Sequence, residues 1–172
     1  MEAIPKEVID MAEDFFARLS PAKQKNMLKE YYKEQVFISS TISYWIENLK
    51  DKNTTRIIES LYLVICRSYE YYGLKLPVIP METCETTYQQ YLKKVNIHDK
   101  NGLMALAIMQ EGLKDICQEN LANYIILKLS GSEGNLVDYT SLTDMGTTQH
   151  IAMILLLLLN NETKKQLRNE IN

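Results

Sequence analysis

The chain has 172 residues, of which 46% are apolar and 24% charged, and its formal net charge at pH 7 is -3. This composition argues against a disordered chain, because enough apolar surface is present to form a core. No segment is strongly basic, which argues against a protein that grips duplex DNA, since such proteins need a concentrated positive face. With 6 Gly and 4 Pro, the chain is expected to be rich in helix and poor in turns.

The N-terminal part predicts two helices separated by a proline. Apolar residues recur at helical spacing over residues 5–19, and Ser20 followed by Pro21 is typical of a helix start. A long second helix is expected to follow, to residue 49. Its segment FISSTIS, residues 37–43, has weak helix preference, which predicts a bend there.

The middle of the chain predicts two more helices around an extended segment. A polar turn over residues 50–53 precedes a helix over 54–72, which Gly73 ends because glycine tolerates the left-handed conformation. Two prolines in residues 74–81, LKLPVIPM, predict an extended segment. A helix over 82–95 and a turn over 96–102 follow.

The C-terminal part predicts a helical stretch over residues 103–129, and the sequence leaves open whether it is one helix or two. After a loop over 130–135, a helix is expected from Thr143 or Asp144 to residue 159, ended by Asn160 and Asn161, with a short helix over 162–171. Residues 151–159, IAMILLLLL, are the most apolar run. They are too few to span a bilayer, which needs roughly 20 apolar residues, so we expect them in the core.

These elements predict an all-α fold, because no segment has the alternation of a strand. We expect one domain over residues 1–172, a bundle of about seven or eight helices around a central apolar helix near residues 145–160. The three cysteines, Cys66, Cys84 and Cys117, are widely spaced and odd in number, which argues against a disulfide framework. Free thiols suggest a reducing compartment, and we expect the cytoplasm.

No residue pattern predicts catalysis, a cofactor or a metal. Glu111, Asp115 and Glu119 share a helical face, but a carboxylate-bridged metal site also needs Glu-x-x-His pairs, which are absent. His98 and His150 have no nucleophile motif near them. We therefore predict no catalytic, cofactor-binding or metal-ligating residue.

Tyrosine is the one compositional oddity, with 11 residues. Tyrosine is enriched at protein interfaces and also at the rims of cores. We predict that a tyrosine-rich surface binds a partner, with the candidate residues Tyr69, Tyr71, Tyr72, Tyr88 and Tyr91. The alternative is that these rings pack against the segment of residues 74–81.

The sequence favours a non-catalytic helical module that binds another protein or regulates one. Two alternatives stay open: a helical domain with an internal pocket for a small apolar ligand, and an enzyme of unrecognised class. The expected partner is another protein. A homo-oligomer stays open, nucleic acid is not expected, and no membrane span is predicted.

Overall fold

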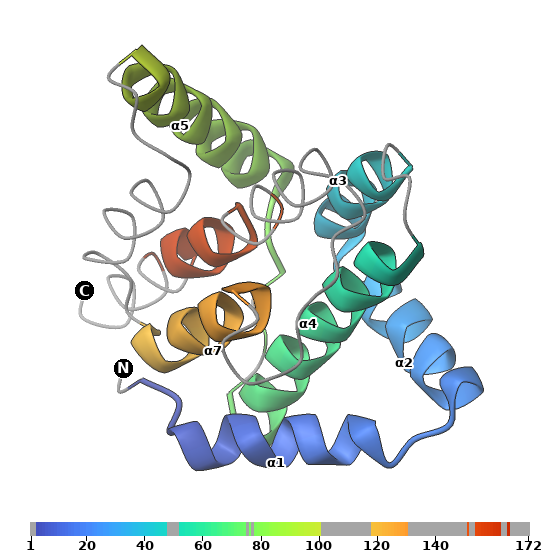
Figure 1. Ribbon diagram of the computed structural model, residues 1–172. Helices are drawn as coiled ribbons and strands as arrows, with labels where there is room; N and C mark the ends of the chain where they lie inside the picture. Colours follow the sequence, from blue (N-terminus) through green and yellow to red (C-terminus); the bar gives the residue numbers. More distant parts are fainter. Residues whose placement is uncertain are drawn as a thin grey trace.

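Helices make up every regular element in the residues that the computed structural model describes, which are residues 3–47, 52–74, 76, 78–100, 118–130, 151, 154–162 and 165. They are α1 (Lys6–Ala17), α2 (Pro21–Glu34), α3 (Val36–Ile46), α4 (Lys52–Tyr71), α5 (Met81–Lys100), α7 (Glu119–Ser130) and a helix over 154–162 (Figure 1). No strand occurs in these ranges. The all-α prediction is therefore confirmed. The predictions for residues 103–117 and 131–150 fall outside the described residues.

The predicted helix restart at Ser20 and Pro21 is confirmed, but the single long helix predicted from there to residue 49 is wrong. Pro21 is the first residue of α2, where its missing N–H costs no hydrogen bond. The chain instead breaks at Gln35, with φ -117° and ψ 58°, and α3 then runs without interruption. The hydroxyls of Ser39 and Ser40 both donate to the carbonyl oxygen of Val36, at 2.9 Å. Serine hydroxyls that bond back to the preceding turn are compatible with a continuous helix, although they weaken it slightly.

The end of α4 follows the predicted glycine cap. Gly73 has φ +74°. The N–H of Gly73 donates to the carbonyl of Glu70, and the N–H of Leu74 donates to that of Tyr69. These two bonds form a Schellman motif, which satisfies carbonyls that the helix end would leave unpaired.

Two other predicted helix boundaries are wrong. α5 continues through residues 96–100, where a turn was predicted, and the last described helix continues through Asn160 and Asn161. Tertiary contacts explain the second case. Asn160 is buried, and the Asn161 amide donates to the Thr87 hydroxyl at 3.0 Å. Asparagine breaks a helix only weakly, so one tertiary hydrogen bond is enough to outweigh its preference for turns.

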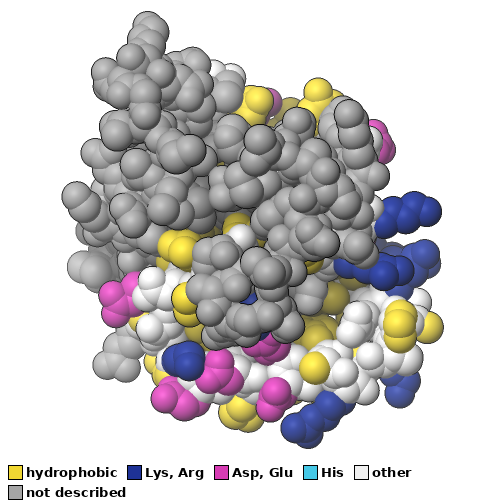
Figure 2. All heavy atoms as spheres, viewed as in Figure 1, with side chains coloured by type: hydrophobic (Ala, Val, Ile, Leu, Met, Phe, Trp, Pro, Cys, Tyr) yellow, Lys and Arg dark blue, Asp and Glu magenta, His cyan; other side chains and the backbone are white. Residues whose placement is uncertain are grey.

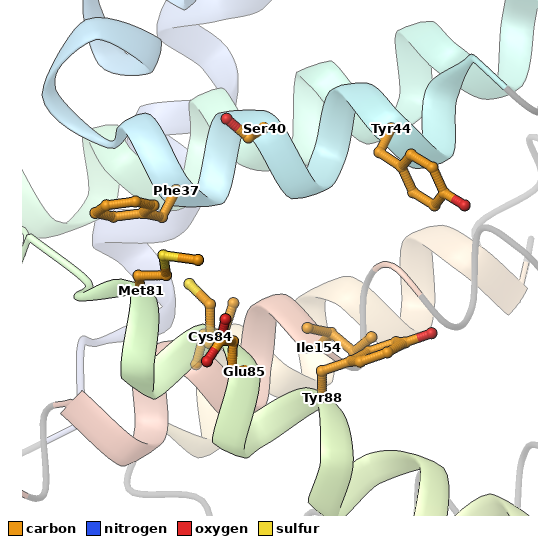
Figure 3. A pocket seen from close by; sticks show the side chains of 9 residues that line it. Phe37, Ser40, Tyr44, Met81, Cys84, Glu85, Tyr88 and Ile154 are labelled. Atoms are coloured by element: carbon orange, nitrogen blue, oxygen red, sulfur yellow. The ribbon is translucent and has the colours of Figure 1, made fainter.

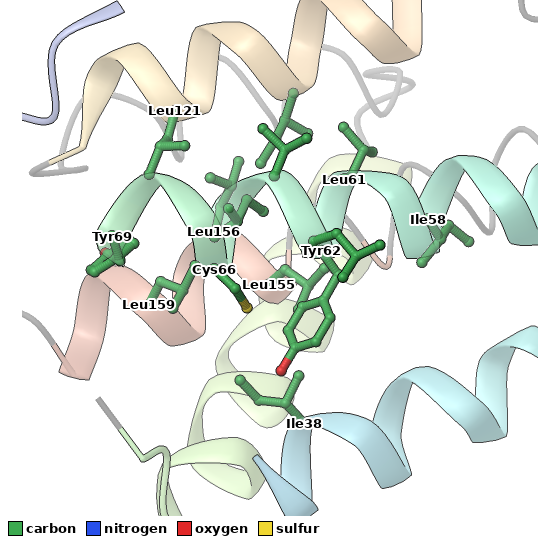
Figure 4. Packing of buried hydrophobic residues seen from close by; sticks show 14 of the residues in the cluster. Ile38, Ile58, Leu61, Tyr62, Cys66, Tyr69, Leu121, Leu155, Leu156 and Leu159 are labelled. Carbon is green, nitrogen blue, oxygen red and sulfur yellow. The ribbon is translucent and has the colours of Figure 1, made fainter. Parts of the chain in front are cut away.

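The core is centred on α4 and the apolar run of the sequence (Figure 4). Residues 61–66 of α4 are buried on every side. α1 and α2 pack on α4, and α7 packs on α1. The buried members of the apolar run are Ile151, Ile154, Leu155, Leu156, Leu158 and Leu159. No helix in the described ranges has the length and apolarity needed to cross a membrane.

Two buried glutamines hold irregular segments against the helices. The Gln118 side-chain oxygen accepts the N–H of Ile4 at 2.8 Å, and the neighbouring Asn120 amide donates to the Ile4 carbonyl at 2.9 Å. The Gln35 side-chain oxygen accepts the N–H of Ile79 at 3.2 Å. Each bond satisfies a buried backbone group that no helix pairs. The second bond fixes the segment that leads into α5 and therefore helps to place α5 beside α3.

Candidate interaction groove

An apolar groove lies between α3 and α5 and has a volume of about 500 Å³. One wall comes from α3, the other from α5, and the 154–162 helix forms the floor (Figure 3). The lining residues are Phe37, Ser40, Tyr44, Met81, Cys84, Glu85, Tyr88, Ile154 and Leu158. We call this site the α3–α5 groove.

Helical spacing explains why these side chains share one groove. Phe37, Ser40 and Tyr44 stand at i, i+3 and i+7, which places them on one face of α3. The α5 wall repeats this spacing from Met81 to Tyr88. The floor residues Ile154 and Leu158 follow the same rule, four residues apart on their helix.

The groove exposes large apolar side chains above a buried floor. Tyr44 is 66% exposed and Met81 54% exposed, whereas Leu158 on the floor is 1% exposed. Phe37 and Tyr88 are also exposed. Singly exposed apolar residues are normal, but a cluster of them over a hollow is typical of binding sites.

The charge of the groove is acidic and its thiol is protonated at neutral pH. Among the lining residues, Glu85 carries a negative charge and none is a lysine or arginine. Burial, and secondarily the charge of Glu85, raises the pKa of the Cys84 thiol above its ordinary value of 9.0. The Ser40 hydroxyl is hydrogen-bonded to a backbone carbonyl. Neither side chain is therefore prepared to act as a nucleophile.

The five tyrosines predicted to bind a partner do not form one surface. Tyr88 lines the α3–α5 groove. Tyr69 is 1% exposed and lies in the core, and Tyr72 is half-buried against the core. Tyr91 lies in α5, but its side chain is outside the described residues.

Tyr71 belongs to a separate cluster between α1 and α4. The guanidinium carbon of Arg67 lies 4.4 Å from the ring centre of Phe15 and 4.6 Å from that of Tyr71. An Arg67 nitrogen also lies 2.6 Å from a carboxylate oxygen of Glu70. The two rings also contact each other edge to face, with their centres 6.1 Å apart, so the guanidinium lies against both of them rather than between them. A cation over an aromatic face stabilises the contact of the helices that carry the two groups. We call Phe15, Arg67 and Tyr71 the Arg67 cluster.

Sequence reasoning missed most of the α3–α5 groove, although one signal for it was present. The α3 segment VFISSTISYWI contains no charged residue. A surface helix usually carries charged or polar residues on the face opposite the core, so large apolar residues there indicate a second apolar surface. Phe37 and Tyr44 lie outside the inward row of Ile38 and Ile42, so α3 is apolar on two faces.

A second hollow, of about 350 Å³, is polar and lies between α5 and the C-terminal helical residues. Three of its side chains, those of Thr83, Glu162 and Lys165, contact one another. The Lys165 ammonium donates to the Thr83 hydroxyl at 2.7 Å, and that hydroxyl lies 3.4 Å from a carboxylate oxygen of Glu162. These contacts join α5 to the C-terminal helical residues and stabilise their packing.

The buried tyrosine and cysteine groups of the core stay uncharged at neutral pH. Burial raises the pKa values of the Tyr62 phenol and the Cys66 thiol far above their ordinary range, and it does the same for Tyr31 and Tyr32. The rings of Tyr32 and Tyr62 lie 5.4 Å apart. These groups pack the interior around α4, and burial favours their neutral forms.

The metal and histidine candidates of the sequence are mostly outside the described part of the chain. Glu111, Asp115 and His150 are not described, nor is the side chain of His98, and Glu119 is exposed at the start of α7. Within the described ranges, no three His, Cys, Asp or Glu side chains gather closely enough to hold a metal ion.

Charged side chains of opposite sign lie over different helices in the view of Figure 2. Figure 2 shows lysine and arginine side chains on the side of α2, and acidic side chains along α1. The lysines of α2 at positions 23, 25, 29 and 33 are exposed, but Glu30 and Glu34 are exposed among them. This mixture makes the α2 surface an ordinary solvated face.

The α3–α5 groove has to be interpreted from its own geometry and chemistry. No protein family, curated protein or solved structure matches this chain.

Proposed function

We propose that this protein is a non-catalytic module that binds another protein through the α3–α5 groove. The observation that carries the proposal is the cluster of exposed apolar side chains on two helices above a buried apolar floor. Burying such side chains against a partner releases about 25 cal/mol per Å² of apolar surface, and aromatic residues contribute most at interfaces.

A small apolar ligand is the second candidate, and the size of the groove favours it. Its volume of about 500 Å³ lies within the range of roughly 300–1,000 Å³ that is usual for small-molecule sites. However, such sites enclose most of their ligand. The rims of this groove, Tyr44 and Met81, are more than half exposed, which suits a large partner better.

The setting we propose is a reducing compartment, with the cytoplasm as the expected location. Cys66 and Cys84 are both free thiols in the structure. Cys84 lies in the groove itself, and an oxidising compartment would expose it to disulfide exchange.

Site-specific photo-crosslinking in the native cells tests the proposal. Tyr44 is replaced by the photoreactive residue benzoylphenylalanine, and Met11, which is 59% exposed on α1, is replaced in a control chain. We expect a covalent adduct with one protein from position 44 and none from position 11. Phe37→Glu should abolish the adduct without lowering the Tm, and Met11→Glu should leave it unchanged.

Two results would contradict the proposal. One is the same pattern of adducts from both positions, which indicates unspecific contact. The other is no adduct from position 44. If the intact chain then carried an extra mass of a few hundred daltons in native mass spectrometry, and Phe37→Glu removed it, the small-ligand candidate would replace the proposal.

A further inference from the structure

The walls of the α3–α5 groove favour a helical occupant over an extended one. Both walls are helices, whose backbone N–H and C=O groups are bonded within the helix. An extended segment that binds by backbone pairing needs a free sheet edge, and these helical walls offer none. A helix satisfies its own backbone and needs only side-chain contacts, so it can lie against these walls without leaving polar groups unpaired.

The length of the groove fits about two turns of a helix. Phe37 and Met81 mark one end, and Tyr44 and Tyr88 mark the other (Figure 3). Each wall therefore covers eight residues, and its seven steps of 1.5 Å make about 10 Å. An occupant of this length presents large apolar side chains at positions i, i+3 or i+4, and i+7.

The charge of the groove adds a second requirement. Glu85 lies about one turn from Met81 and one turn from Tyr88, in the middle of the α5 wall. A bound apolar segment would remove water from this carboxylate, which is costly unless a cation compensates. Glu85 is exposed in the groove, and none of the lining residues supplies a cation, so a cation on the occupant would compensate this carboxylate on binding.

We infer that the occupant is an amphipathic helix of a partner protein that carries two or three large apolar residues on one face and a lysine or arginine that pairs with Glu85. This inference rests on the proposed function. It defines the chemistry of the partner at the same site.

The test begins with the adduct formed from position 44. Mass spectrometry of the digested adduct identifies the attached segment, and a synthetic peptide of that segment is titrated onto the full chain. We expect the peptide to gain helical circular dichroism on binding. Glu85→Lys should weaken binding at least about tenfold, because it places two cations together. The matched control is Glu82→Lys, at an exposed position of α5 outside the groove, and it should change binding less than about threefold.

A charge reversal in the peptide completes the test. Replacing its basic residue by glutamate should restore binding to the Glu85→Lys chain. Binding without a gain of helix, equal or tighter binding by Glu85→Lys, or an adduct with a second copy of this chain would each overturn the inference. Absence of any position-specific adduct would instead overturn the proposed function, so the two failures are distinguishable.

Discussion

At the scale of single residues, two buried glutamines determine how the irregular parts of the chain are held. Gln35 and Gln118 each lie directly outside a helix, and each accepts a backbone N–H from a distant isoleucine. Nothing in the sequence marks them, because glutamine is usually exposed. Their role depends on which backbone groups the fold leaves unpaired, and these are known only once the helices have packed.

Replacing Gln118 by leucine should lower the free energy of unfolding by about 1–3 kcal/mol, since the buried N–H of Ile4 then loses its acceptor. Gln35→Leu should cost less, because its bond is longer, at 3.2 Å rather than 2.8 Å. Urea denaturation measures both losses. The exposed Gln89→Leu is the control, and a similar loss there would show that the effect is not due to the buried hydrogen bond.

Glu59 should make stability depend on pH. Burial raises the pKa of this half-buried carboxyl above its ordinary value of 4.5, although the charges of Lys25 and Arg56 act in the opposite direction. Between 4.5 and the raised value, the folded chain binds more protons than the unfolded chain, so this group's contribution to stability falls as pH rises. Glu59→Gln removes the charge that burial disfavours.

We therefore expect Glu59→Gln to raise the Tm at pH 7 relative to the parent chain and to raise it less at pH 4. Thermal denaturation at both pH values gives the two differences. The exposed Glu47→Gln is the matched control and should show no such trend. A gain at pH 4 equal to the gain at pH 7 would mean that ionisation of Glu59 does not destabilise the fold.

At the scale of the elements, the sequence predicts helices well and their ends less well. The Ser20–Pro21 start and the Gly73 end were predictable because the reason for each is local: a proline without an N–H and a glycine at positive φ. The continuation of the last helix through Asn160 and Asn161 was not predictable, because Asn161 is bonded to Thr87 of another helix. Local preference is a weak guide where tertiary contacts compete with it.

The candidate site was also predictable only in part, because local sequence features do not show which side chains the fold exposes. Tyr88 was among the predicted partner-binding residues and lines the groove, while Tyr69 is in the core. Tyrosine content indicates rings that suit an interface, but it does not indicate which ring faces water. The uncharged α3 is the better signal, since its sequence places large apolar side chains on a second face besides the face that packs into the core.

The Arg67 cluster should stabilise the contact between α1 and α4 without contributing to partner binding. Tyr71→Ala removes one of the two rings beside the guanidinium and should cost about 1 kcal/mol of unfolding free energy. Formation of the adduct from position 44 should not change. Tyr88→Ala, in the groove, should show the reverse: lost adduct and nearly unchanged stability. If Tyr71→Ala lost the adduct at unchanged stability, the binding surface would lie at the Arg67 cluster instead.

At the scale of the whole molecule, α4 and α5 differ in how they are attached. Residues 61–66 of α4 are buried on every side, whereas most described side chains of α5 are exposed. α5 is held by the groove floor, by α3 and by polar bonds to the C-terminal residues (Figure 1). A helix held by few buried apolar contacts opens at a lower free energy than the core.

Amide hydrogen exchange should therefore be slowest in α4 and faster in α5. Ile65→Ala creates a cavity in the core and should cost about 2–5 kcal/mol. It should speed exchange of the slowest amides, those of α4, because these exchange through global unfolding. Thr83→Val removes the hydroxyl that contacts Lys165 and Glu162 and should speed exchange only in α5 and the C-terminal residues. If Thr83→Val also accelerated α4, α5 would unfold together with the core. The groove could then not adjust to a partner by local movement of its α5 wall.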